Sequence, residues 1–192
     1  MKITQFFAAL VIVIFCCTVA CAFTASYEQT TSGPGLLTPQ SRLVKIKDNK
    51  VWMEMEGPQG RGIVIMDGAT MYSYNPSTNT AVKLKNPVTA YMNVLSDYAS
   101  YLKSLNAKLV GSETVGPYDC DTYEFIDPRV NVPSRVWLWK AYEFPVKVEM
   151  KVPTGVMTTI MKDVKVGINI DDSEFMLPPG VKIIDEKDLS RQ

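Results

Sequence analysis

Residues 86–106, with the sequence NPVTAYMNVLSDYASYLKSLN, decide how the rest of the chain can be arranged. Apolar residues recur there at i, i+3, i+4 and i+7 and form one stripe: Val88, Tyr91, Met92, Leu95, Tyr98, Ala99, Leu102 and Leu105. Asn86 suits the N-cap and Pro87 the first helical position. The pattern predicts one helix of roughly 30 Å with a single apolar face.

Short strands separated by turn residues are predicted on both sides of this helix. In residues 51–56 (VWMEME) and 146–152 (VKVEMKV), Val or Met occupies every second position, and the positions between them carry one Trp and otherwise charged side chains. This alternation is the period of a half-buried strand. Asp67-Gly68 is typical of a hairpin turn. The whole pattern indicates roughly ten antiparallel strands, with the helix between two groups of them.

One helix of about 20 residues is little cover for the apolar face of so large a sheet. We therefore predict an α+β fold, in which a curved antiparallel sheet forms a half-open barrel with a helical lid. Two interpretations of the helix remain open. It completes an ordinary hydrophobic core, or helix and sheet part to admit an apolar ligand.

Composition excludes several classes of function. The 192 residues carry 20 Lys and Arg against 20 Asp and Glu, and this balance argues against a nucleic-acid partner. The absence of histidine excludes Ser-His-Asp and Cys-His nucleophiles and zinc sites that contain histidine. Glu54 and Glu56 alternate with apolar residues, which is typical of a solvated strand face. We expect no enzymatic activity, no metal and no cofactor.

Three of the four cysteines lie in the first 21 residues, and Cys120 is the only one in the rest of the chain. One cysteine supports neither a disulfide framework nor a four-thiolate metal site. Without a histidine to activate it, Cys120 is predicted to be a small buried residue. A Cys21–Cys120 disulfide becomes an alternative if Cys21 is retained without lipid.

Residues 1–22 are predicted to be a signal peptide, which leaves one domain over residues 23–192. Lys2 precedes an apolar run, and Ala20-Cys21-Ala22 has the small-x-small form of a cleavage site. Cleavage before Cys21, as in bacterial lipoproteins, would instead place a lipid anchor on Cys21. A permanent transmembrane helix is the third alternative, for which the run is marginal in length. All three place the domain outside the cytoplasm.

The order of the motifs resembles that of the bacterial outer-membrane lipoprotein-sorting proteins of the LolA/LolB superfamily. The similarity rests on three stretches in particular: DGATMYSYNPSTN (67–79), EFPVKVEM (143–150) and DSEFMLPPGVKIID (172–185). It implies an open, curved sheet with a helical lid around an apolar cavity that holds acyl chains of lipoproteins or other lipids. The carriers have a helix before the first strand, which is not predicted here. Their functional arginine on an early strand could correspond to Arg42 or Arg61.

The candidate ligand-binding residues are apolar side chains expected to line the cavity: Met53, Met55, Met92, Leu95, Val148 and Met150. Methionine suits a surface that must fit varied acyl chains, and the alternative for these residues is ordinary core packing. Trp137 and Trp139 share a strand face, where core packing is favoured over stacking on a ligand.

The predicted function is that of an exported carrier of the bacterial cell envelope that binds lipids or lipoproteins. The alternative is an envelope sensor or interaction module on the same fold, with or without a lipid anchor. Expected partners are acyl chains and an envelope membrane or receptor protein. The expected location is the periplasm, either in solution or anchored through Cys21.

Overall fold

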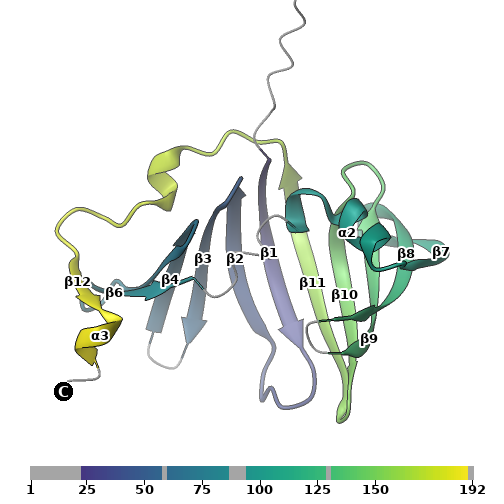
Figure 1. Cartoon of the computed structure of the whole chain (residues 1–192), viewed down its shortest axis with the longest axis horizontal. Coiled ribbons are helices and arrows are strands. Elements are labelled where there is room, and N and C mark those ends of the chain that lie inside the picture. The colour runs from purple at the N-terminus through teal and green to yellow at the C-terminus, as the bar shows by residue number, and fades with distance from the viewer. Residues whose placement is uncertain (1–22, 58–59, 87–93, 129–130, 190–192) are drawn as a thin grey trace, which may run out of the picture.

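The computed structural model describes residues 23–57, 60–86, 94–128 and 131–189. Twelve strands form one sheet (Figure 1). The first six are β1 (Thr24–Ser32), β2 (Gln40–Lys47), β3 (Lys50–Gly57), β4 (Gly60–Asp67), β5 (Thr70–Asn75) and β6 (Thr80–Lys85). The next five are β7 (Lys108–Val115), β8 (Tyr118–Asp127), β9 (Val132–Trp139), β10 (Phe144–Val152) and β11 (Gly155–Val166). The remaining elements are α2 (Tyr98–Ser104), the 3₁₀ helix η1 (Asp172–Phe175), β12 (Lys182–Asp185) and α3 (Glu186–Leu189).

The strand order is β12-β6-β5-β4-β3-β2-β1-β11-β10-β9-β8-β7, so the sheet is open, with β12 and β7 at its edges. Neighbouring strands are antiparallel except β12, which pairs in parallel with β6. The predicted curved antiparallel sheet is confirmed. The parallel pairing of β12 was not expected from the sequence.

One face of the sheet curves inward around the main core. Val51 of β3 and Met66 of β4 share a buried cluster with Tyr118 of β8 and Val146 of β10, although these two groups of strands lie far apart in the sheet order. The Tyr118 hydroxyl accepts a hydrogen bond of 2.8 Å from the backbone N–H of Val164 on β11. The sheet must therefore bend around this cluster, and we call this side the inner face.

The predicted continuous helix over residues 86–106 is wrong at Asp97. Residues 94–96 are helical, but Asp97 has φ −148° and ψ 63°, and α2 begins after it. The Asp97 carboxylate accepts a hydrogen bond of 3.1 Å from the Ser100 N–H, because aspartate is a better N-cap than a helix interior residue. The predicted apolar stripe is nevertheless correct within α2. Tyr98 and Leu102 are buried against Phe125 of β8 and other residues of the sheet.

A second cluster covers the outer face of the first half of the sheet. Ile170 and Phe175, around η1, pack against Ile63 and Ile65 of β4 and Tyr74 of β5. This C-terminal segment runs across the molecule from β11 towards β12 (Figure 1). It supplies cover that a single helix could not.

Lysines of β2 and β3 hold the same segment by charge. Lys45 pairs with Glu174 at 2.7 Å, and Lys47 and Lys50 pair with Asp172 at 3.2 and 3.0 Å.

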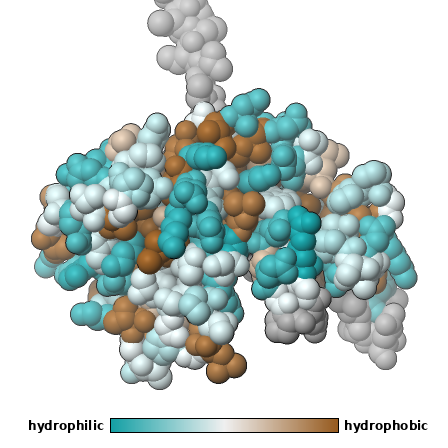
Figure 2. Space-filling view, turned by 180° about the vertical axis from the view of Figure 1, so that it is seen from behind, coloured by the Kyte–Doolittle hydropathy of each residue, from teal (hydrophilic) through white to brown (hydrophobic). Residues whose placement is uncertain are grey.

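Seen from behind, the surface is largely hydrophilic with separate hydrophobic patches (Figure 2). Within the described residues, no helix has the length and apolar character needed to cross a membrane.

Candidate functional site

Four of the predicted ligand-binding residues lie on the inner face, on two strands. Met53 on β3 pairs with buried Val44 of β2, and Met55 follows two residues later on the same side of the strand. Val148 and Met150 have the same relationship on β10. All four side chains are half-buried. Met53 and Val148 pack against the two core clusters, and all four side chains keep part of their surface exposed.

The strands between these two pairs carry mixed side chains on the inner face. Met157 of β11 lies opposite Met150, and Thr159 lies opposite Val148. The hydroxyls of Thr31 and Thr159 share a hydrogen bond of 3.2 Å across β1 and β11. The inner face thus has apolar side chains on β3 and β10, and between them hydroxyl groups of β1 and β11 that are hydrogen-bonded to each other.

Leu95 connects the two halves of the inner face. It packs against the main core cluster and also against the cluster that α2 forms with β8, β9 and β10. Its half-buried side chain therefore lies where a lid would meet both walls. Met92, the remaining predicted residue, lies outside the described residues, as does Cys21.

The two candidate arginines have different environments. Arg42 pairs with Gln29 of β1 and with Met55, so it belongs to the inner face. Burial raises the pKa of the neighbouring Tyr27, and the positive charge of Arg42 opposes that shift in part. Arg42 forms no ion pair within the described part of the chain. Arg61 instead donates a hydrogen bond to Glu54 on the opposite face.

Two other predicted features have definite surroundings. Cys120 is fully buried, as predicted, and burial raises the pKa of its thiol, which disfavours the reactive thiolate. Trp137 is buried in the core, but its indole N–H donates a hydrogen bond to Glu113. The Lys147 ammonium also lies 3.9 Å from the centre of the Trp137 ring. These polar partners of Trp137 could not be predicted from the sequence, because they come from β7 and β10.

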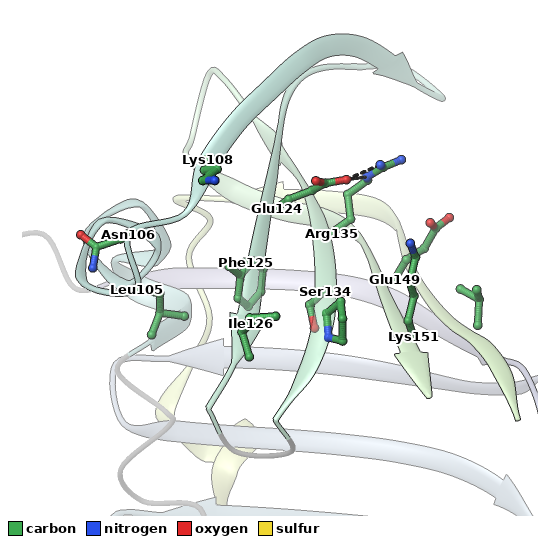
Figure 3. A pocket seen from close by; sticks show the side chains of 12 residues that line it. Leu105, Asn106, Lys108, Glu124, Phe125, Ile126, Ser134, Arg135, Glu149 and Lys151 are labelled. Atoms are coloured by element: carbon green, nitrogen blue, oxygen red, sulfur yellow. Dashed lines mark hydrogen bonds and ion pairs between the residues drawn. The ribbon is translucent and has the colours of Figure 1, made fainter. Parts of the chain in front are cut away.

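A pocket of about 460 Å³ lies elsewhere, between the end of α2 and strands β7 to β11 (Figure 3). Of the five predicted residues that the structure describes, none lines it. Its apolar lining is Leu105, Phe125, Ile126, Pro133 and Val156, and its polar lining is Asn106, Lys108, Glu124, Ser134, Arg135, Glu149 and Lys151. Sequence reasoning missed it because the lining comes from five strands and a helix end that only the sheet register brings together.

Comparison with known proteins shows similarity in structure rather than in sequence. No protein-family model matches the chain, and no curated protein sequence matches it. An uncharacterised conserved protein from Thermus thermophilus superposes with a TM-score of 0.62 at 10% identity, over 86% of this chain and 91% of that one. LprF from Mycobacterium bovis superposes with a TM-score of 0.52 at 9% identity, over 83% and 90% of the two chains.

A third similar structure is the MucA/MucB complex of Pseudomonas aeruginosa, with a TM-score of 0.53 at 13% identity. The match covers 84% of this chain and 58% of that chain. At these identities the similarities establish a shared fold. They agree with the open, curved sheet described above.

Proposed function

We propose that the protein is an exported member of the LolA/LolB superfamily that holds acyl chains non-covalently on the inner face of its sheet. The arrangement that carries this proposal is the pair of half-buried flanks, Met53 with Met55 and Val148 with Met150, on either side of the central strands. Leu95 packs against the clusters on both sides. Such a surface is apolar, adaptable and partly open, which are the properties that an acyl chain needs.

The driving force is removal of the acyl chain from water. Each buried methylene contributes about 0.8 kcal/mol, so a chain of a dozen or more methylenes needs only partial burial for useful affinity. Flexible methionine side chains can fit chains of different shape at small cost. We assign the role of the superfamily's early-strand arginine to Arg42, since it shares the inner face with Met55.

The protein is proposed to work in the periplasm, either in solution or held to a membrane through Cys21. Removal of residues 1–22 remains a prediction from the sequence. We propose binding and release of lipid without a catalytic step.

The test compares lipid retention by matched glutamate variants. Met53→Glu and Met150→Glu place a charge on the inner face at half-exposed positions, so the fold is expected to survive. Ile183→Glu is the control, because Ile183 is 52% exposed on the edge strand β12 and pairs with Ala81 of the outer cluster. Phospholipid that co-purifies with each protein is extracted and quantified by mass spectrometry.

Loss of lipid from the two methionine variants, with retention by Ile183→Glu, supports the proposal. Equal lipid in all three folded variants and in the wild type contradicts it. Circular dichroism and thermal unfolding establish that each variant is folded before the lipid is measured.

A second candidate is an envelope sensor that binds a protein partner on the same fold. It is favoured by the similarity to a structure solved as the MucA/MucB complex, in which a protein of similar fold is bound to another protein. A lipid anchor at Cys21 would fit this fixed role. Affinity purification from the native envelope, with and without exchange of the inner-face methionines, distinguishes a protein partner from lipid alone.

A further inference from the structure

The pocket between the end of α2 and strands β7 to β11 has an uneven balance of paired and unpaired charges. Glu124 accepts hydrogen bonds from both Nε and a terminal nitrogen of Arg135. Glu149 pairs with Lys147 at 2.7 Å. Both carboxylates of the lining are therefore already matched by a cation.

The two lysines of the lining have no such match. Lys108 and Lys151 form no ion pair within the described part of the chain. Figure 3 shows them on opposite sides of the pocket, with Glu124 and Arg135 between them. Both lysine charges help to lower the pKa of Glu124, after the larger effect of Arg135, so both act on the same central region. The pocket therefore has a surplus of positive charge.

The other lining is apolar and partly open to solvent. Ile126 is 53% exposed and Val156 is 44% exposed, and both line the pocket, as does buried Phe125. Ile126 pairs with Pro133 across β8 and β9, and Lys151 pairs with Val156 across β10 and β11. Apolar and cationic side chains thus adjoin one another along the same strand ends. The volume of about 460 Å³ is within the usual range for small-molecule sites.

We propose that this pocket binds an amphipathic anion, whose carboxylate or phosphate group lies among Lys108, Arg135 and Lys151. Its apolar part lies on Phe125, Ile126 and Val156. A cation would be repelled by the unpaired lysines, and a fully polar anion would leave the apolar side chains exposed to water. None of the lining residues is one of the inner-face residues named in the proposed function, but the two sites adjoin, because Ser134 of the lining lies opposite Met150.

The experiment titrates the full-length protein with three probes that share one alkyl chain: hexanoate, hexyl phosphate and hexylammonium. Binding is followed by NMR chemical-shift changes at low salt, because added salt screens these exposed charges. Either anion is expected to bind more tightly than hexylammonium, with shifts at Ile126 and Val156. The order of the two anions identifies the favoured head group. Binding of hexylammonium as tight as that of both anions overturns the proposal.

Charge variants of the lining then test the proposal, because they are expected to change the affinity for the anion in opposite directions. Lys108→Gln combined with Lys151→Gln should weaken binding of the anion by about tenfold, since two charge-assisted contacts are lost. Glu124→Gln should strengthen it, because Arg135 is freed from its carboxylate. Lys83→Gln combined with Lys85→Gln removes the same charge from β6 and should leave binding unchanged.

The Met53→Glu variant distinguishes binding in this pocket from binding on the inner face. It should leave binding of the hexyl anions unchanged, even if it removes co-purified lipid. Anion binding that survives the Lys108 and Lys151 substitutions, or that is lost in Met53→Glu while the protein stays folded, overturns the assignment of the pocket.

Discussion

Met150 of β10 and Met157 of β11 lie directly opposite each other in the sheet, and both side chains are half-buried. They form an adaptable, sulfur-rich pair on the inner face next to Val148 and Thr159. A ligand on this face would cover both sulfur atoms. The rate at which these two methionines are oxidised therefore reports whether a ligand is bound on the inner face.

Bound lipid should slow the oxidation of these two methionines by dilute hydrogen peroxide. Met176 is the internal control, because it is 67% exposed in the C-terminal segment. Peptide mass spectrometry of samples with and without added phospholipid measures sulfoxide at each position. Protection of Met150 and Met157 with no change at Met176 is expected. Equal rates at Met150 and Met157 in both samples would place the lipid elsewhere.

Thr122 on β8 is 5% exposed, and its hydroxyl has no hydrogen-bond partner among the described residues. A buried hydroxyl without a partner loses its hydration and gains nothing in return. Thr122→Val should therefore stabilise the protein by about 1 kcal/mol. Chemical denaturation measures the change. Thr114→Val, at an exposed position on β7, is the control and should change the free energy of unfolding little.

The ion pair between Lys50 and Asp172 should make docking of the C-terminal segment depend on pH. The pKa of Asp172 is lowered in the folded protein, first by its hydrogen bond with Lys50 and then by Lys47. A lowered carboxyl pKa stabilises the fold above the ordinary value of 3.8 and ceases to do so as pH falls through the lowered value.

The difference in thermal midpoint between wild type and Asp172→Asn should therefore be present at pH 7 and vanish in acid. Lys50→Gln and the double variant complete a double-mutant cycle, which isolates the interaction between Lys50 and Asp172. A difference that stays constant from pH 7 to below the ordinary carboxyl pKa would exclude this linkage.

The sequence predicted those features that depend on local periodicity. Alternation placed Met53 with Met55 and Val148 with Met150 on the same side of their strands, and helical spacing placed Tyr98 and Leu102 on one buried stripe. Hairpin residues such as Asp67-Gly68 placed the turn between β4 and β5. Each of these features is decided by residues within one or two turns of each other.

Features that depend on distant segments were not predicted. The break at Asp97 is local but was also missed, because the apolar stripe continues past Asp97 while its carboxylate caps α2. The parallel pairing of β12 with β6, and the contact of Phe175 with the outer cluster, join segments about 100 residues apart along the chain. The pocket around Arg135 requires the register of β8, β9 and β10, which periodicity cannot supply.

The most direct measurement is native mass spectrometry of the protein expressed with its own first 22 residues in a bacterial host. It reports the mature N-terminus, any acyl modification of Cys21 and any bound lipid in one spectrum. The proposed function predicts a cleaved chain with non-covalent lipid adducts that disappear in Met53→Glu but persist in Ile183→Glu. A folded wild-type protein that carries no lipid, and takes up none from added phospholipid vesicles, would contradict it.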